Sequence, residues 1–252
     1  MHILCTNDDG YMAPGLAILQ RAARRLGSVH VVAPDREQSA TSHSLTLHLP
    51  LRARTGPGGV SVVDGTPTDC VILALSALLE ERPTVCFSGV NHGSNMGEDV
   101  LYSGTVAAAM EATVLGIPSV AVSYAGRDLT DGLGWSEPLS DLLKQVLARP
   151  FPTDTLFNVN LPPIPPAEAK GVRVTRLGRR RYSDSLMRGH DPMGKEYYWI
   201  GASTPAWSGS ADSDFRAVEE GYVSVTPLHL DLTNYRLLEE VRAWDLTMNP
   251  AP

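Results

Sequence analysis

Short runs of apolar residues alternate, through the first 160 residues, with longer stretches in which apolar residues recur at helical spacing. The short runs predict buried strands, and the longer stretches predict amphipathic helices. The predicted strands cover residues 2–6, 29–34, 84–91, 119–126 and 156–162, and the predicted helices cover residues 14–27, 66–83, 103–118 and 136–150. Strands and helices that alternate in this way indicate βαβ units, and therefore an α/β fold with a doubly wound, mostly parallel sheet.

The region before the second predicted helix has a different pattern. Residues 44–54 and 59–65 alternate apolar and polar side chains, which predicts two half-exposed strands, with antiparallel pairing as one arrangement. The helix that follows can be capped by Thr66 or Thr68, and Pro83 ends it.

The pattern changes near residue 150, where Pro-rich connections begin. After them come three strand-like segments and a last predicted helix, at residues 171–178, 196–203, 221–228 and 235–244. We predict a core at residues 1–165 that carries the active site, and a C-terminal arm or hairpin region at residues 166–252 that includes the last helix. Extended segments bury little surface alone, so we expect this region to reach over the core or onto another subunit and to support oligomerisation.

Composition excludes several classes of protein. The 252-residue chain has a net charge of −7 and a pI near 5.5, whereas non-specific nucleic-acid binding needs a basic surface. Its three cysteines are scattered among apolar residues, which indicates reduced core side chains of a cytosolic protein. CxxC and HExxH spacings do not occur, so zinc sites of those kinds are not expected. We find neither a signal-peptide pattern nor an apolar run of membrane-spanning length, and we expect a cytoplasmic protein without nucleic-acid or membrane partners.

Polar residues gather in the loops that follow the predicted strands. In an open parallel sheet, ligands bind beyond the carboxyl ends of the strands. The loops at these ends include "NDDG" after the first strand, "APDREQSATSHS" after the second and "SGVNHGSNMGEDVLYSGT" from residue 88 onward. They are rich in Asp, Asn, Ser, Thr and Gly, which supply oxygen ligands, hydroxyl groups and accessible backbone amides. This convergence is the main functional signal in the pattern.

Two adjacent carboxylates end the first strand. Asp8 and Asp9 would point to opposite faces if the strand continued, but Asn7 and Gly10 are residue types that allow a turn. Neighbouring carboxylates repel each other unless water surrounds them or a cation lies between them. The pair therefore forms either a solvated turn or a site for a hard cation such as Mg²⁺, Mn²⁺ or Ca²⁺, and its place at a strand end favours the site.

A Ser-Gly-Thr sequence opens the third predicted helix. The first amides of a helix lack internal partners, so this start suits an anion, with Ser103 and Thr105 as hydroxyl donors and Gly104 permitting close approach. The alternative is an ordinary N-cap, which is far more common. Asn91 and Asn95, in the preceding loop, are either amide ligands or turn residues.

Several motifs of other enzyme classes do not occur. The loop from residue 88 matches neither the Walker pattern nor GxGxxG, which disfavours P-loop ATP hydrolysis and ordinary dinucleotide binding. The nucleophile elbow GxSxG is not found, so covalent serine catalysis is disfavoured. The basic cluster "RLGRRRYSD" at residues 176–184 could meet an anionic substrate, although a solvated or subunit-facing surface is the commoner role.

Four blocks occur in order at close intervals: "ILCTNDDGYMAPG", "VVAPDREQSATSHSLTLH", "DGTPTDCV" and "SGVNHGSNMGEDVLYSGTVAAAMEA". Together they resemble the SurE family, stationary-phase survival proteins that act as metal-dependent 5′/3′-nucleotidases. The segments "RRRYSD", "KEYYWI" and "EEGYVSVTPLHLDLTN" extend the resemblance to nearly the whole chain. The resemblance implies a Rossmann-like core whose extended C-terminal arm is exchanged between subunits, giving a homodimer or homotetramer.

The resemblance also implies a set of site residues and an activity. One divalent cation per subunit, Mg²⁺ or Mn²⁺, would be held by Asp8, Asp9, Ser39 and Asn91. The phosphate of a nucleoside monophosphate would lie among Asn95, Ser103, Gly104 and Thr105. We expect direct hydrolysis of the phosphomonoester, with Asp8 or Asp9 orienting the attacking water or taking its proton.

Three alternatives remain open at the level of sequence. Asp8 could instead form an aspartyl-phosphate, although phosphatases of that kind usually have a DxD spacing. The pocket could belong to a non-catalytic nucleotide sensor, or the chain could be a purely structural oligomer. Sequence does not choose the preferred nucleotide, the metal, or dimer against tetramer.

Overall fold

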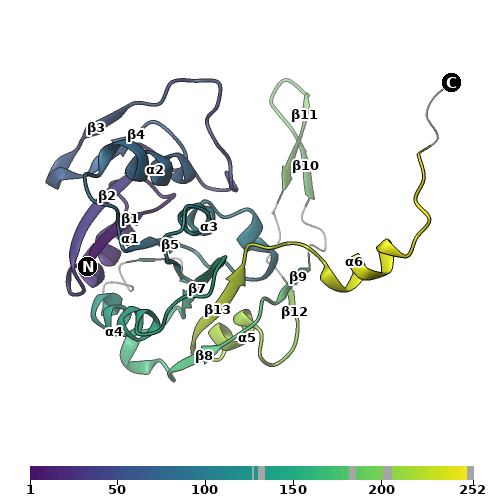
Figure 1. Ribbon diagram of the computed structural model, residues 1–252. Helices are drawn as coiled ribbons and strands as arrows, with labels where there is room; N and C mark the ends of the chain where they lie inside the picture. Colours follow the sequence, from purple (N-terminus) through teal and green to yellow (C-terminus); the bar gives the residue numbers. More distant parts are fainter. Residues whose placement is uncertain (127, 130–133, 182–185, 201–205, 249–252) are drawn as a thin grey trace.

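Thirteen strands are present in the part of the chain that the computed structural model describes, which is residues 1–126, 128–129, 134–181, 186–200 and 206–248 (Figure 1). They are β1 (His2–Thr6), β2 (Ser28–Pro34), β3 (Ala53–Thr55), β4 (Ser61–Val63), β5 (Val85–His92), β6 (Ser119–Tyr124), β7 (Thr155–Leu161), β8 (Val172–Val174), β9 (Arg179–Arg181), β10 (Leu186–His190), β11 (Glu196–Ile200), β12 (Ala206–Ser208) and β13 (Val223–His229). The α-helices are α1 (Pro14–Arg24), α2 (Pro67–Leu73), α3 (Gly104–Val114), α4 (Ser136–Leu147), α5 (Asp214–Glu219) and α6 (Tyr235–Arg242).

Nine of these strands form one sheet in the order β3-β4-β2-β1-β5-β6-β7-β13-β8. The six strands from β4 to β7 in this order run parallel to one another, whereas β3 and β13 run antiparallel to their neighbours β4 and β7. The predicted doubly wound, mostly parallel α/β sheet is therefore confirmed. Its five predicted apolar strands appear as β1, β2, β5, β6 and β7.

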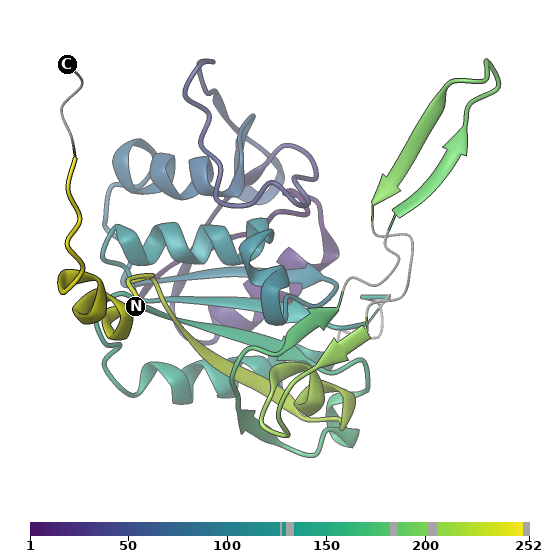
Figure 2. The same cartoon turned by 90° about the vertical axis from the view of Figure 1, so that its right-hand side faces the viewer.

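Helices cover both faces of the sheet, as the turned view in Figure 2 shows. Helices α1 and α4 pack together on one face, over a core that includes Ile3, Phe87 and Leu139. On the other face α2 and α3 pack together, over a core that includes Leu4, Cys86 and Ala108. Strands buried on both faces need apolar side chains at successive positions, which is why they appear in the sequence as continuous apolar runs.

Two sequence predictions need correction before the third helix. Of the strand predicted at residues 44–54, only its end forms a strand, as part of the antiparallel pair β3 and β4. Three of its leucines stay exposed, including Leu47 at 76% and Leu49 at 73%, because no neighbouring strand pairs with this part of the segment among the described residues. The helix predicted at residues 66–83 ends earlier, since α2 continues only as a π-helical segment to Leu78. The residues that follow it, Glu80 and Glu81, are exposed and have no apolar surface to bury.

The predicted cap at the start of α2 is confirmed. The Thr66 hydroxyl accepts a hydrogen bond from the Asp69 amide, and the Asp69 carboxylate accepts one from the Thr66 amide. This reciprocal capping box satisfies two amides that the helix itself leaves without partners. Asp69 also accepts hydrogen bonds from the amide and hydroxyl of Thr46, which holds the exposed loop against the helix.

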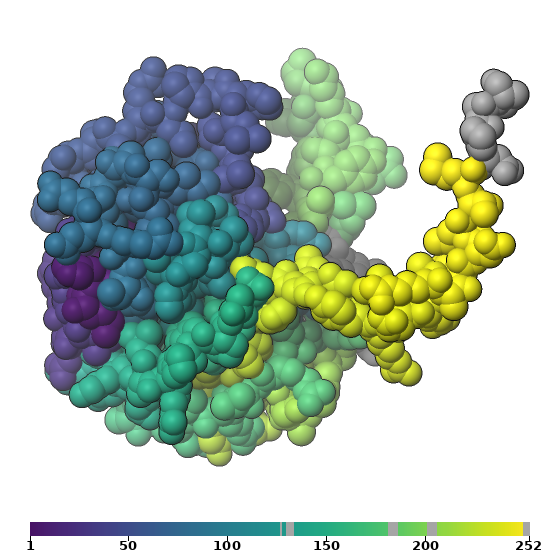
Figure 3. All heavy atoms as spheres, viewed as in Figure 1, coloured from purple at the N-terminus to yellow at the C-terminus, as the bar shows by residue number. Residues whose placement is uncertain are grey.

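The C-terminal half contributes to the main sheet and also projects from it. Strand β13 lies between β7 and β8 and so extends the sheet. The hairpin β10–β11 stands away from the sheet, and α6 projects separately, as Figures 2 and 3 show. The strand predicted at residues 196–203 forms β11 over its first five residues, and residues 201–203 lie outside the described ranges. In the described chain, we find no helix that has both the length and the apolar character to span a membrane.

The order of the strands directs attention to one edge of the sheet. From β1 the chain passes to β2 on one side, and later returns to place β5 on the other side of β1. The register pairs Thr6 of β1 with Ser88 of β5, so the loops beyond these strands emerge next to each other. A crevice at such a switch in strand order is the usual ligand site of an open α/β sheet.

Candidate active site beyond β1 and β5

The chain turns sharply after β1. The Asn7 side chain is fully buried, and its amide nitrogen donates a hydrogen bond of 2.9 Å to the Gly10 carbonyl oxygen. Gly10 has a φ of 95°, a left-handed conformation that costs glycine little. The strand therefore ends at Thr6, as predicted, and both following carboxylates leave the pleat of the strand.

The carboxylate of Asp8 lies against the start of α3. Asp8 is only 4% exposed, and it accepts a hydrogen bond from the hydroxyl of Thr105. The same hydroxyl lies 3.4 Å from the amide oxygen of Asn91. A Cβ atom on Gly104 would lie 2.8 Å from the Asp8 Cβ, so a larger residue would push the helix and the loop apart. Glycine thus permits the contact between this helix start and Asp8.

Burial changes the electrostatics of both acids. It raises the pKa of Asp8 to about 6, against the hydrogen bonds from Thr105, and the nearby Asp9 charge adds to the rise. Burial also raises the pKa of Asp9, whose carboxylate accepts a 3.1 Å hydrogen bond from the His92 backbone amide. In the described ranges, neither carboxylate forms an ion pair with a lysine or arginine. Two crowded, desolvated carboxylates without a lysine or arginine partner in the described ranges are a suitable place for a cation.

A hollow of about 260 Å³ opens in front of Asp8. Five of the eight predicted site residues line it: Asp8, Ser39, Asn91, Asn95 and Ser103. The other three, Asp9, Gly104 and Thr105, lie directly behind this lining, held by the contacts described above. Ser39 is exposed and donates a 2.7 Å hydrogen bond to Glu37, so its hydroxyl stands at the open side of the hollow.

The N-cap interpretation of the helix start is confirmed, and the anion site stays a prediction. Ser103 is the N-cap of α3, because its hydroxyl oxygen accepts a 3.1 Å hydrogen bond from the Val106 amide. It nevertheless lines the hollow, where its hydroxyl hydrogen can still be donated. Thr105 is fully buried and directed at Asp8, and its contact with a phosphate stays a prediction.

Asn95 is held in place by two asparagines of β7. Its backbone amide donates to the Asn160 side-chain oxygen at 2.9 Å, and its carbonyl oxygen accepts from Asn158 at 2.8 Å and Asn160 at 3.0 Å. Its side-chain amide donates to the hydroxyl of Ser123 on β6 at 2.9 Å. Sequence reasoning missed this support, although polar residues at alternate positions of a buried strand were a visible signal.

Arg180 is a further residue to which sequence reasoning assigned no individual role. It lines the hollow, and its guanidinium donates a 2.5 Å hydrogen bond to the Asp99 carboxylate. Its backbone amide donates to Glu98 at 2.6 Å, which ties β9 to the loop after β5. The neighbouring Arg179 is exposed. Neighbouring side chains of β9 point in different directions, so Arg180 lines the hollow and Arg179 faces solvent. The basic cluster therefore includes one arginine that could meet a substrate and one on a solvated surface.

The donor set fits a hard divalent cation. Carboxylate, hydroxyl and amide oxygens come from Asp8, Asp9, Ser39 and Asn91, and such ligands suit Mg²⁺, Mn²⁺ or Ca²⁺. The described residues contain no cluster of three or more His, Cys, Asp or Glu side chains that could hold a metal. A cation would therefore depend on the two acids together with neutral oxygens, which leaves room for water and a substrate oxygen.

Comparisons with known proteins all find the same family. The family model described as "Survival protein SurE" matches residues 3–184. A protein of Gemmatimonas aurantiaca named 5′-nucleotidase SurE is 59% identical over 249 residues, which cover 97% of this chain and 98% of the relative. A protein of the same name from Methylococcus capsulatus is 48% identical over 244 residues, with 97% of each chain covered.

A solved structure extends the likeness to three dimensions. The crystal structure of the SurE protein from Aquifex aeolicus matches with a TM-score of 0.85 at 44% identity, over 96% of this chain and 98% of that one. Because the family model covers most of the chain and the relatives match it almost from end to end, the protein belongs to the SurE family.

Proposed function

We propose that this chain is a phosphatase that hydrolyses nucleoside 5′-monophosphates to nucleoside and phosphate and depends on one divalent cation, Mg²⁺ or Mn²⁺, per subunit. The observation that carries the proposal is the meeting of two acids, an arginine and a helix start at one hollow. The name 5′-nucleotidase SurE, borne by its relatives, supports nucleoside monophosphates as the substrate class. Nucleoside 3′-monophosphates are further candidates.

The cation would be held by the two acids with Ser39 and Asn91. When bound, it would supply positive charge and lower the pKa of a bound water. Asp8 and Asp9 are the groups that can orient the attacking water and accept its proton. Thr105 fixes the Asp8 carboxylate in one orientation for that role.

The remaining groups suit the phosphate. The amide of Gly104 and the hydroxyl of Ser103 lie at the positive end of α3, where an anion is stabilised. The Asn95 side chain and the Arg180 guanidinium belong to residues that line the same hollow, and they add further donors. Fixed donors of this kind stabilise the charge that develops on the equatorial oxygens during phosphoryl transfer.

The test is a phosphate-release assay with AMP and GMP in the presence of Mg²⁺ or Mn²⁺, followed by EDTA. We expect turnover that EDTA abolishes, and we expect Asp8→Asn and Asp9→Asn to remove it while the circular dichroism spectrum is retained. Asp141→Asn, on the exposed side of α4, is the matched control and should keep full activity. Tight nucleotide binding without turnover would instead identify a non-catalytic sensor.

The oligomeric state and location belong to the same proposal. Aromatic and aliphatic side chains of the hairpin β10–β11 are exposed, including Trp199 at 60% and Ile200 at 83%. Exposed apolar groups on a projecting hairpin suit contact with another subunit, in a homodimer or homotetramer. We propose that this oligomer works in the cytoplasm.

A further inference from the structure

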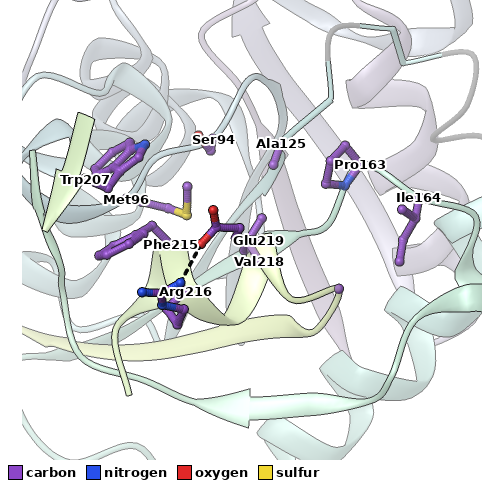
Figure 4. Close-up of a pocket in the computed structure, with 11 residues that line it drawn as sticks. Ser94, Met96, Ala125, Pro163, Ile164, Trp207, Phe215, Arg216, Val218 and Glu219 are labelled. Carbon is purple, nitrogen blue, oxygen red and sulfur yellow. Dashed lines mark hydrogen bonds and ion pairs between the residues drawn. The ribbon is translucent and has the colours of Figure 1, made fainter. Parts of the chain in front are cut away.

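A larger hollow, of about 580 Å³, is shown in Figure 4. It shares Ser94 with the hollow in front of Asp8, which is called the catalytic hollow. Met96, Trp207 and Phe215 form one wall, and Ile164 lies on the opposite side. This volume is within the range of about 300–1,000 Å³ that is typical of small-molecule sites. The proposed hydrolysis assigns no role to this hollow.

Two separate contacts join the two hollows. Ser94 lines both of them, and the next two residues face different ways, since Asn95 lines the catalytic hollow and Met96 lines the larger one. In the second contact, the guanidinium of Arg180 lies 5.9 Å from the ring centre of Trp207. Arg180 lines the catalytic hollow and Trp207 the larger one. A molecule with its phosphate in the first hollow is thus close enough to extend into the second.

The wall of the larger hollow suits a flat ring. The Trp207 and Phe215 rings are stacked, with centres 5.6 Å apart and planes 14° apart. Phe215 and Met96 are buried and fixed, whereas Trp207 is half-buried and keeps part of its ring accessible. Aromatic side chains bind nucleobases by stacking, whatever the base, because every base has a π-face.

Polar groups at the rim suit a sugar. Glu219 and Arg216 are exposed partners in an ion pair of 3.1 Å, drawn as the dashed line in Figure 4. The Glu219 carboxylate can accept hydrogen bonds from ribose hydroxyls, and the Ser94 hydroxyl can donate or accept. Apolar walls with a few polar groups are the usual composition of a ligand pocket.

We infer that the larger hollow binds the nucleoside part of the substrate, with the base against the wall that contains Trp207. This inference rests on the proposed function, because it takes the occupant to be attached to a phosphate in the catalytic hollow.

The experiment compares AMP with ribose 5-phosphate, which carries the same phosphate and sugar without the base. For the wild-type protein we expect kcat/KM to be about tenfold or more higher for AMP, in line with one base–aromatic stack. Trp207→Ala should lower kcat/KM for AMP to the level of ribose 5-phosphate and leave ribose 5-phosphate unchanged. Ala125→Leu, which fills the hollow from another element, should have the same selective effect.

A second readout does not depend on turnover. Adenosine should bind the wild-type protein in a calorimetric titration and should bind both variants about tenfold more weakly. Trp244→Ala is the control for loss of a tryptophan, since Trp244 is 52% exposed after α6, and it should change neither measurement. Circular dichroism checks the fold of each variant.

The outcomes separate the two proposals. Equal kcat/KM for AMP and ribose 5-phosphate in the wild-type protein, or equal losses on both substrates in the variants, would overturn the nucleoside site and leave the phosphatase intact. Adenosine binding without hydrolysis of either ester would support the nucleoside site and overturn the phosphatase. A wild-type protein that does not bind adenosine overturns the nucleoside site whatever its activity.

Discussion

The hydroxyl of Thr105 donates a hydrogen bond to the carboxylate of Asp8, and so joins the first turn of α3 to the loop after β1 across 97 residues of sequence. Both groups are buried, and a hydrogen bond to a charged group contributes about 1.5–3 kcal/mol. We expect Thr105→Val, which keeps the shape and removes the hydroxyl, to lower kcat/KM for AMP by about tenfold or more. Thr105→Ser should restore most of it, and full activity of the valine variant would contradict a positioning role.

The pH dependence of stability in the metal-free protein should carry the signature of Asp8. Its pKa is raised from 3.8 to about 6, so between these values the folded state keeps a proton that the unfolded state has released. The free energy of unfolding should therefore fall as pH rises through this window, by at most about 3 kcal/mol from this group. Thermal unfolding in EDTA from pH 4 to 7 measures the fall.

Asp8→Asn isolates that contribution from those of other carboxyl groups. The variant should lose this part of the slope, and the same slope in both proteins would contradict the assignment. Added Mg²⁺ should stabilise the wild-type protein more at pH 7 than at pH 4, because a cation and protons compete for the same carboxylate.

Arg180 should affect every phosphate ester alike. Arg180→Gln removes a charged donor from the hollow, and we expect kcat/KM to fall about 100-fold for both AMP and ribose 5-phosphate. Because the change also leaves Asp99 without this partner, the double variant with Asp99→Asn should show a similar loss. Arg179→Gln, on the exposed side of the same strand, is the matched control and should retain activity.

Gly104 should tolerate no side chain. An added Cβ would lie 2.8 Å from the Cβ of Asp8, so Gly104→Ala must move α3 or the acidic loop. We expect a loss of Mn²⁺ affinity and of activity, measured by calorimetric titration and phosphate release. Gly134→Ala is the control, because its nearest contact would be an ordinary 3.4 Å to Pro166. Normal Mn²⁺ binding by Gly104→Ala would refute the close packing.

The hairpin β10–β11 should control assembly. We expect light scattering to show a dimer or tetramer for the wild-type protein, and a shift towards monomer for Trp199→Ser with Ile200→Ser. Both side chains are exposed on the hairpin, so the change costs the isolated subunit little. Lys195→Ala, at the turn before β11, should leave the oligomer unchanged. A wild-type monomer at micromolar concentration would contradict the proposed role.

Strands buried on both faces were predictable from sequence, whereas the pairing of a half-exposed segment with a neighbouring strand was not. The run around Phe87 indicates β5 because three successive apolar residues, Val85 to Phe87, are best buried in a strand that is covered on both faces. The alternation around Leu47 gives the same local signal as a strand, but this segment meets no partner strand among the described residues. A local sequence pattern indicates which side chains a segment could bury, but it does not indicate whether a neighbouring strand is present to cover them.

In the candidate site too, local sequence indicates some residues, whereas others are brought into place only by tertiary contacts. Asp8 and Asp9 were identified because their place at the carboxyl end of a strand favours a site, and because the family resemblance implies them as metal ligands. Arg180 belongs to a cluster of three arginines, and only the pairing of β9 with β12 decides which of them enters the hollow. Asn158 and Asn160 act through the backbone of Asn95, a contact across more than 60 residues that no local pattern encodes.

The position of β13 has a consequence for synthesis on the ribosome. The side chains of β7 hydrogen-bond to the backbone of Asn95. On the edge away from β6, β7 pairs with β13, which ends at residue 229 of 252. Until that late segment emerges, the nascent sheet exposes an unpaired, apolar edge at β7, which is the kind of edge that joins other chains. Translation that stops early would therefore yield an aggregating fragment rather than a smaller working protein.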